Sequence, residues 1–262
     1  METIIFGGGR LGTAIAATLR ERGDSAPTIV GRPDRAVPAD RPRIAMHQAA
    51  GVAFECSRGE AVATNVAAAL DAGIRRLVIA TTGWSSDRAT VERLLRDRGA
   101  AAVASANFSL GMLLFGRLVD RAVELYGPLA DFDPYLVEWH RAAKPDRPSG
   151  TARDLAQRIV AAHPRKQRIA DPGRPGSADP AELELAVVRA GASPGVHTVG
   201  FDAPGETVEL RLTARDRSAY AAGAVAAADW LCATRRSPGI HDFDQVVDEL
   251  LGAAAPRLVA VG

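Results

Sequence analysis

Short apolar runs alternate with longer amphipathic stretches through the first hundred residues of the chain. The runs predict buried β-strands, and the stretches predict helices that cover a parallel sheet. We expect strands at residues 4–6, 28–30, 43–46, 52–56, 77–80 and 101–104. We expect helices at residues 11–22, 60–72 and 86–98. This order is typical of an α/β domain with a Rossmann-like, doubly wound sheet.

The pattern changes after Asn107, where strand-like runs are separated by loops rich in proline and glycine. The run at 206–213 alternates apolar Val208 and Leu210 with charged residues, which predicts a strand with one buried face. We expect further strands at residues 135–139, 183–189 and 195–201. These runs predict a second domain, of the α+β class, with a mixed or antiparallel sheet.

The end of the chain returns to helical patterning. A helix rich in small residues is expected at 218–231, followed by a Pro238-Gly239 turn and a closing helix at 245–251. We expect these elements to rejoin the first domain. The predicted domains are therefore residues 1–109 together with 218–262 for dinucleotide binding, and residues 110–217 for substrate binding and oligomerisation.

The composition is that of a globular protein, with 262 residues of which 47% are hydrophobic and 24% are charged. Its 32 basic and 31 acidic residues give a formal net charge of +1, so nothing points to nucleic acid or an anionic membrane surface. Small molecules are the expected partners. The N-terminus lacks a signal-peptide pattern, and no apolar run reaches membrane-spanning length.

Cysteine usage bears on the compartment and on metals. The only two cysteines, Cys56 and Cys232, are far apart and lack the spacing of metal ligands. This pattern fits a reducing compartment and argues against structural zinc. We therefore expect a cytoplasmic protein without a metal site.

A glycine-rich loop follows the first expected strand and precedes the first expected helix. Residues 7–12 read G-G-G-R-L-G, in the strand, loop and helix context that gives such a motif meaning. Glycines let the backbone approach a pyrophosphate, and free N–H groups at a helix N-terminus attract anions. The loop predicts dinucleotide binding. The alternative is a turn that needs glycine for steric reasons alone.

The choice of cofactor depends on the residues that follow the second strand. An acidic residue there would bind a ribose 2′-hydroxyl and repel the extra phosphate of NADP. Residues 31–35 read G-R-P-D-R, so the expected position has no carboxylate, and Arg32 can contact a 2′-phosphate. We expect NADPH as the preferred cofactor and NADH as the other possibility. The structural alternative is that Arg32 only lies in a solvated loop.

A second cluster combines an imidazole, several cations and a Ser-Gly-Thr turn. Residues 137–151 read V-E-W-H-R-A-A-K-P-D-R-P-S-G-T, and Lys144 is one of only two lysines in the chain. Such a span can hold an anionic substrate beside a proton donor. We expect Arg141 and Lys144 to keep His140 neutral until a dicarboxylate binds. Ser149 would cap a helix that begins two residues later, a structural role that also creates a carboxylate site.

These residues carry a resemblance to a known family. Residues 138–152, E-W-H-R-A-A-K-P-D-R-P-S-G-T-A, resemble the dihydrodipicolinate reductase signature E-x-H-H-x-x-K-x-D-x-P-S-G-T-A. Further blocks are similar to family segments in the same order: residues 54–62 to D-F-T/S-x-P-E-A-V, 80–84 to G-T-T-G-W, 105–111 to A-P-N-F-S-L-G, 195–199 to G-x-H-x-V and 216–224 to S-R-x-x-F-A-x-G-A. Several blocks in the correct order are more specific than one glycine motif.

The resemblance implies a reductase that uses NAD(P)H to reduce a dihydrodipicolinate-type cyclic imine dicarboxylate in lysine and diaminopimelate biosynthesis. It also implies a homotetramer built by the sheet of the central domain. It gives His140 the role of proton donor, and Lys144 the role of aiding catalysis and holding a carboxylate. The expected substrate contacts are Arg141, Ser149, Gly150, Thr151 and Arg217. The expected nucleotide contacts, from the resemblance and the loop motif together, are Gly7, Gly9, Arg10, Leu11, Gly12, Arg32, Thr81, Thr82, Gly83 and Asn107.

The sequence departs from the family pattern at three positions. Arg141 replaces the second histidine of the His-His pair, Leu212 stands where a late histidine is expected, and Phe6 stands where the nucleotide loop usually has its first glycine. Arg141 supplies a cation but cannot exchange a proton at neutral pH. Two alternatives therefore stay open: a paralogous reductase of another cyclic imine or enamine acid, and a catalytically silent nucleotide-binding protein.

Overall fold

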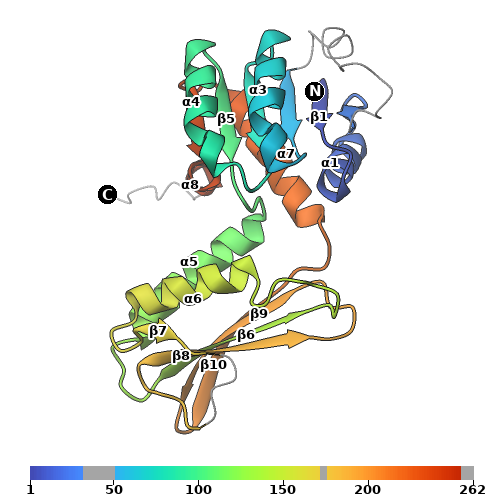
Figure 1. Cartoon of the computed structure of the whole chain (residues 1–262). Helices are drawn as coiled ribbons and strands as arrows, with labels where there is room; N and C mark the ends of the chain where they lie inside the picture. Colours follow the sequence, from blue (N-terminus) through green and yellow to red (C-terminus); the bar gives the residue numbers. More distant parts are fainter. Residues whose placement is uncertain (32–50, 172–175, 255–262) are drawn as a thin grey trace, which may run out of the picture. The chain divides into compact units, whose positions relative to one another are not determined.

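The computed structural model describes residues 1–31, 51–171 and 176–254. Arg32 and the expected strand at 43–46 lie outside the described residues. The chain divides into two compact units: unit 1 is Met1–Leu110 with Arg217–Gly262, and unit 2 is Gly111–Asp216. Figure 1 colours the chain from N-terminus to C-terminus through both units. Among the described helices, none is long and apolar enough to cross a membrane.

Unit 1 is built on a six-stranded parallel sheet with the order β11-β5-β4-β3-β1-β2. Its strands are β1 (Thr3–Phe6), β2 (Thr28–Val30), β3 (Val52–Glu55), β4 (Arg76–Ile79), β5 (Ala101–Ala104) and β11 (Gly239–Asp242). β2 lies on one side of β1, and β3, β4 and β5 follow on the other. The strand order therefore reverses at β1. In a parallel sheet, a crevice forms at the point of such a reversal, outside the carboxyl ends of the strands. The expected Rossmann-like fold is confirmed.

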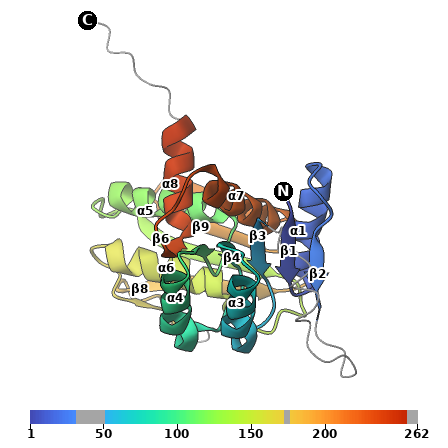
Figure 2. The same cartoon turned by 90° about the horizontal axis from the view of Figure 1, so that it is seen from above.

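Helices cover both faces of this sheet, as Figure 2 shows. α3 (Val62–Asp71) and α4 (Arg88–Asp97) lie on one face, whereas α1 (Arg10–Glu21) and α7 (Ser218–Ala233) lie on the other. The remaining elements of unit 1 are the 3₁₀ turns η1 (Gly59–Ala61) and η2 (Ser85–Asp87) and the last helix, α8 (Phe243–Ala254). The two-sided cover explains why the strands read as continuous apolar runs.

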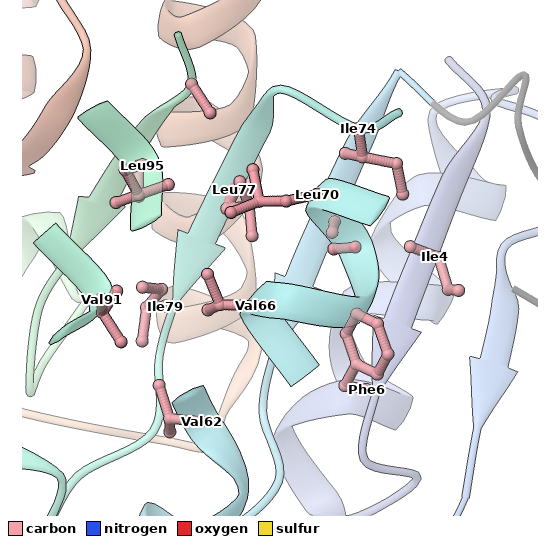
Figure 3. Close-up of a cluster of buried hydrophobic side chains, with 14 of the residues drawn as sticks. Ile4, Phe6, Val62, Val66, Leu70, Ile74, Leu77, Ile79, Val91 and Leu95 are labelled. Carbon is pink, nitrogen blue, oxygen red and sulfur yellow. The ribbon is translucent and has the colours of Figure 1, made fainter. Parts of the chain in front are cut away.

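The core of unit 1 includes a layer between the sheet and the helices α3 and α4 (Figure 3). Val66 and Leu70, one turn apart on α3, and Leu95 of α4 pack with Leu77 and Ile79 of β4. Each of these side chains is at most 1% exposed. Burying one such aliphatic side chain stabilises the fold by about 1.5–3 kcal/mol. This packing holds the strand ends from which the predicted nucleotide loops start.

The sequence pattern does not predict the last strand of unit 1. It indicates only a turn at Pro238-Gly239, but Gly239–Asp242 form β11, which pairs in parallel with β5. Gly239 begins the strand with φ at +128°, a conformation that favours glycine. A four-residue strand of this kind is defined by the neighbouring ladder more than by its own composition.

Unit 2 contains a five-stranded mixed sheet with the order β10-β9-β6-β8-β7. Its strands are β6 (Asp133–His140), β7 (Arg168–Ile169), β8 (Glu182–Arg189), β9 (Val196–Ala203) and β10 (Glu206–Thr213). The pairs β6–β8 and β7–β8 are parallel, whereas β6–β9 and β9–β10 are antiparallel. Of the two sheet types expected from the sequence, the mixed one is therefore observed.

Two helices, α5 (Leu110–Tyr126) and α6 (Gly150–Ala162), pack against one face of this sheet (Figure 1). No helix or strand is predicted from the sequence at residues 110–126. Phe115, Val119 and Val123 nevertheless recur every four residues there, and all three are buried in the core of unit 2. This is the periodicity of an amphipathic helix, so the signal for α5 was present.

β6 divides its side chains between the two faces of the sheet. Leu136, Glu138 and His140 are buried, whereas the alternate residues Tyr135 and Trp139 are more exposed. Leu136 belongs to the core under α5 and α6, so Glu138 and His140 point to the same, helix-covered face. Buried polar side chains need partners, and these two mark a candidate site.

Candidate functional site

The glycine-rich loop of unit 1 lies at the carboxyl end of β1, beside the loop that follows β3. Gly7 has φ at +102°, and a Cβ atom there would lie 2.5 Å from the Cys56 carbonyl oxygen. A Cβ atom on Gly12, in the first turn of α1, would lie 2.0 Å from the Gly7 carbonyl oxygen. Both positions need glycine for the packing of the loop itself. Gly9 has open space where its Cβ would be, which leaves room for a ligand to approach the backbone.

The N-terminus of α1 supplies free backbone N–H groups. Gly9 is its N-cap, no side chain caps it, and its first turn contains no acidic residue. Gly9, Arg10 and Leu11 therefore stand together where a helix has unpaired N–H groups and the positive end of its dipole. This arrangement fits the pyrophosphate of a dinucleotide.

A buried carboxylate joins two loops at this edge of the sheet. Glu55, 1% exposed at the end of β3, accepts hydrogen bonds from the amide of Ser57 at 2.8 Å and from the Ser57 hydroxyl. It also accepts from Asn65 Nδ2 at 2.7 Å and from Thr81 Oγ1 at 3.1 Å. Burial raises the pKa of Glu55 above its ordinary value, although these hydrogen bonds oppose the shift. Thr81, expected as a nucleotide contact, is thus buried and engaged with Glu55.

The other expected nucleotide contacts lie in the loops after β4 and β5. Thr82 and Gly83 are exposed, and Gly83 has φ at +76°. Asn107 Oδ1 accepts a hydrogen bond from the Ser109 amide at 2.9 Å, which shapes the loop after β5. All of these loops start at carboxyl ends of parallel strands, so the structure brings the expected contacts to one edge of the sheet. Arg32 is the exception, because it lies outside the described residues.

The predicted catalytic residues lie in unit 2, around the end of β6. Glu138 is fully buried, and its carboxylate accepts hydrogen bonds from the Ser149 amide at 2.9 Å, from the Ser149 hydroxyl and from the Arg189 guanidinium at 2.7 Å. Burial would raise the pKa of Glu138, but the hydrogen bonds from Ser149 and Arg189 outweigh it and hold the pKa below its ordinary value. Glu138 is therefore an ionised carboxylate inside the unit.

Ser149 also connects this carboxylate to α6. Its Oγ accepts a hydrogen bond from the Ala152 amide at 3.1 Å, which confirms the predicted capping role. Gly150 and Thr151 form the first turn of the helix, with Gly150 exposed and Thr151 half-buried. Unpaired N–H groups in such a turn can bind a carboxylate.

His140 ends β6 with its ring in a defined orientation. Nδ1 lies 3.2 Å from the Pro194 carbonyl oxygen, which can only accept, so Nδ1 carries a proton. Nε2 is buried, has no hydrogen-bond partner among the described residues and lies 3.5 Å from Glu138 Oε2. A second proton therefore binds at Nε2. This makes Nε2 the atom that can give a proton to a substrate.

Burial and three charged neighbours set the protonation of His140. Burial has the largest effect and lowers its pKa, and the charges of Lys144 and Arg189 lower it further. Glu138 and the Pro194 carbonyl oppose these effects, but the pKa stays below its ordinary value. The expected effect of Lys144 is confirmed. Arg189 on β8, which strand pairing places beside β6, also lowers this pKa.

The remaining predicted substrate contacts occupy different positions. Lys144 Nζ lies 2.7 Å from Asp146 Oδ1, and this contact lowers the pKa of Asp146. Arg141 donates its backbone N–H to the Ser193 carbonyl at 2.7 Å, and its side chain is half-buried. Arg217 belongs to unit 1, where it is exposed at the start of α7. Within unit 2 the structure thus gathers His140, Glu138 and Ser149.

A second histidine, His197, which is not among the predicted site residues, lies beside His140. The antiparallel register of β6 and β9 places His197 opposite Glu138, and the two imidazole rings meet edge to face with centroids 5.4 Å apart. His197 is 5% exposed, and its Nε2 lies 3.8 Å from Glu138 Oε2. Burial, and then the charge of His140, lower the pKa of His197 to about 4. His197 is neutral at neutral pH, so His140 takes up the first proton of the pair.

Comparison with known proteins identifies the family. The family model described as "Dihydrodipicolinate reductase, C-terminus" matches residues 111–247. A 4-hydroxy-tetrahydrodipicolinate reductase from Halorhodospira halophila is 33% identical over 266 residues, covering 93% of this chain and 97% of the relative. One from Methanococcoides burtonii is 34% identical over 212 residues, covering 80% of this chain and 77% of the relative.

The chain belongs to the dihydrodipicolinate reductase family. It is accordingly a reductase that uses a nicotinamide nucleotide and acts on a small molecule.

Solved structures share the fold. A dipicolinate-bound dihydrodipicolinate reductase from Paenisporosarcina sp. TG-14 has a TM-score of 0.70 at 18% identity, covering 92% of this chain and 97% of that chain. A biliverdin reductase from Synechocystis sp. PCC 6803, in complex with biliverdin and NADP+, has a TM-score of 0.51 at 14% identity, covering 96% of both chains. At these identities the likeness shows the fold alone.

One block of the dihydrodipicolinate reductase pattern contains His197. The block at 195–199 matches G-x-H-x-V, but the match gives the histidine no role. Leu212, where the family pattern has a histidine, lies directly opposite His197 in the register of β9 and β10. Arg189 lies outside every matching block. Strand pairing, more than sequence proximity, brings the residues of this candidate site together.

Because His197 is buried and neutral, it makes stability depend on pH. Its pKa is about 6.5 in an unfolded chain and about 4 in the fold, so the folded state binds fewer protons between these values and loses stability as pH falls from 6.5 towards 4. We expect this group alone to reduce the free energy of unfolding by about 2 kcal/mol between pH 7 and pH 5. Urea denaturation should show that His197→Gln flattens the pH dependence by this amount. The control His241→Gln, a change in unit 1, should keep the wild-type slope; equal slopes for all three proteins would contradict the assignment.

Proposed function

We propose that this chain reduces 4-hydroxy-tetrahydrodipicolinate to tetrahydrodipicolinate with NAD(P)H, a step of lysine and diaminopimelate biosynthesis in the cytoplasm. The relatives' names support the substrate. Free Cys56 and Cys232 support a reducing compartment. The observation that carries the chemistry is His140, whose Nδ1 is held by a carbonyl and whose buried Nε2 is left for proton transfer.

In this proposal His140 is the general acid. Glu138 Oε2, at 3.5 Å, stabilises a proton on Nε2 against the effect of burial. A bound dicarboxylate adds negative charge nearby and raises the pKa of His140, so the histidine is charged when its proton is needed. Nε2 then gives the proton to the substrate. A bound nicotinamide nucleotide would supply the hydride. The 4-hydroxyl group leaves as water, so hydride, proton and lost water together account for the conversion to tetrahydrodipicolinate.

Cations and helix amides hold the two carboxylates of the substrate. Lys144 exchanges its partner Asp146 for a substrate carboxylate, and Arg141 supplies a second, permanent charge. The first turn of α6, at Gly150 and Thr151, offers unpaired amides. Arg217 is proposed as a further substrate contact. These groups orient the substrate and select for its two negative charges.

A paralogous reductase of another cyclic imine or enamine acid is the second candidate, and Arg141 favours it. A guanidinium is wider than an imidazole and binds a carboxylate as a fork, so it can suit a differently placed acid group. An NADPH-oxidation assay with freshly generated 4-hydroxy-tetrahydrodipicolinate, beside other cyclic imine acids, separates the candidates. Turnover of the first supports our proposal, and turnover of only the others supports the paralogue. Nucleotide binding without turnover indicates a silent protein.

Substitutions should separate proton transfer from substrate binding. His140→Gln removes the transferable proton, so kcat should fall by about 10²- to 10⁴-fold with little change in KM. Arg141→Ala removes a contact that is made in the ground state and in the transition state alike, so it should mainly raise KM. Lys144→Ala should both lower kcat and raise KM. His163→Gln, at another buried histidine of unit 2, is the matched control and should resemble the wild type. If His140→Gln keeps kcat while Arg141→Ala abolishes it, the assigned roles are wrong.

The preference for NADPH is proposed from Arg32, which replaces the carboxylate expected of an NAD-specific loop. Arg32→Ala should raise KM for NADPH about tenfold to a hundredfold, because one charge-assisted hydrogen bond contributes about 1.5–3 kcal/mol. KM for NADH should change little. Steady-state assays with both cofactors test this, with Arg35→Ala as control. Equal effects of Arg32→Ala on both cofactors would refute the role.

We also propose a homotetramer formed through the sheet of unit 2. α5 and α6 pack on one face of this sheet, and the opposite face carries apolar side chains. Trp139 of β6 and Val188 of β8 lie opposite one another in the register, and each is 41% exposed. Apolar side chains gathered on an open sheet face favour association with other copies.

Sedimentation velocity should give four times the mass of the chain at micromolar concentration. Val188→Glu puts a charge on the proposed interface and should shift the protein to smaller species, because a buried unpaired carboxylate is costly. Leu118→Glu, on α5, is the control: Leu118 is 58% exposed and lies outside the sheet, so its variant should stay tetrameric. A stable wild-type monomer would show that the proposed assembly is wrong.

A further inference from the structure

Glu138, His140 and His197 bring together three side chains of the kinds that bind transition metals. Nε2 of His140 and Nε2 of His197 lie 3.5 Å and 3.8 Å from Glu138 Oε2, and the ligand atoms of the three residues all lie within 4.8 Å of one another. Zinc bonds of about 2.0–2.1 Å place neighbouring ligand atoms of a tetrahedral site roughly 3.3–3.4 Å apart. The separations of 3.5 Å and 3.8 Å from Glu138 Oε2 are close to this spacing.

The three groups are in the protonation states that metal binding requires. Glu138 is ionised, because its hydrogen bonds with Ser149 and Arg189 hold its pKa down. Burial lowers the pKa of His140 and of His197, so both imidazoles are neutral at neutral pH. Few protons need to be displaced when an ion binds. Nε2 of His140 also has no hydrogen-bond partner within the described part of the chain.

The surrounding hydrogen bonds are of the kind that orient metal ligands. A histidine ligand usually donates its other N–H to a carbonyl or carboxylate, and ligating carboxylates are themselves hydrogen-bonded. Nδ1 of His140 donates to the Pro194 carbonyl, which leaves Nε2 as the ligand atom. Oε1 of Glu138 accepts hydrogen bonds from the Ser149 amide and from Arg189. Oε2 accepts one from the Ser149 hydroxyl and faces the two histidines.

Two cations near the cluster reduce its affinity for a metal ion. Arg189 is already paired with Glu138 through Oε1 at 2.7 Å, and Lys144 is paired with Asp146 at 2.7 Å. Their charges are thus partly compensated, but they still oppose a divalent ion. We expect an affinity much weaker than that of structural zinc sites.

We propose that Glu138, His140 and His197 form a binding site for a divalent transition-metal ion, with Zn²⁺ as the best fit, and that the ion inhibits the enzyme by occupying Nε2 of His140. Three protein ligands leave a fourth position for water. The binding part of this proposal stands on the cluster geometry. The inhibitory part rests on the proposed function, in which Nε2 of His140 gives the proton.

Calorimetric titration of the full chain with ZnCl₂ at pH 7.5, after EDTA treatment and dialysis, tests the binding part. We expect one ion per chain, with affinity at least tenfold lower in His197→Ala and in Glu138→Gln. His163→Ala is the matched control, because His163 is also a buried histidine of unit 2 whose Nε2 has no partner among the described residues; it should bind as the wild type does. A Kd weaker than about 1 mM, or unchanged affinity in both cluster variants, would overturn the site.

A measurement on the wild type keeps the test valid if a cluster variant fails to fold. In protein labelled with ¹⁵N-histidine, Zn²⁺ should shift the ring nitrogens of two of the five histidines, His140 and His197. Shifts at other histidines only would overturn the proposal.

Inhibition is measured by NADPH oxidation. Zn²⁺ should lower kcat with half-effect near its Kd, EDTA should restore activity, and Mg²⁺ should have no effect because it prefers oxygen ligands. Binding at the cluster without inhibition would overturn the inhibitory part. The titration needs no turnover, so an inactive chain that still binds one ion would contradict the proposed function and support the metal site.

Discussion

An ionised carboxylate buried without compensation is among the most costly arrangements in a protein, and Glu138 sits in β6 with no exposed surface. The Ser149 amide and hydroxyl and the Arg189 guanidinium offset this cost. Those bonds tie the start of α6 and the end of β8 to β6. They also place a fixed negative charge 3.5 Å from Nε2 of His140. The position and the proton affinity of the proposed general acid thus follow from how one buried charge is satisfied.

Unit 1 also contains a buried carboxylate, at the sheet edge that carries the predicted nucleotide-binding loops. Glu55, at the end of β3, gathers donors from its own loop, from α3 and from Thr81 after β4. A carboxylate that accepts several hydrogen bonds fixes the loops that donate them. Burial raises the pKa of Glu55, whereas for Glu138 the hydrogen bonds from Ser149 and Arg189 outweigh burial and lower the pKa. Glu55 in unit 1 holds loops in place, whereas Glu138 in unit 2 also raises the proton affinity of His140.

The same cluster can serve proton transfer or metal binding, but not both at once. Both uses need Nε2 of His140, and both depend on Glu138 as the nearby anion. His197 is neutral in the fold and so leaves the first proton to His140, yet a neutral imidazole is also a metal ligand. The cations Lys144 and Arg189 favour an anionic ligand and oppose a metal ion.

The sequence by itself determined the parallel sheet of unit 1, the glycine loop, the family, and the cluster from His140 to Ser149, because each depends on neighbouring residues whose spacing is set by local geometry. It did not predict β11, and it passed over α5 although its periodicity is clear. The tertiary structure alone decided that Arg189 and His197 complete the site, 49 and 57 positions beyond His140 in the sequence. Their places come from the register of β6 with β8 and β9. Register depends on burial and pairing between distant strands, so no local pattern contains it.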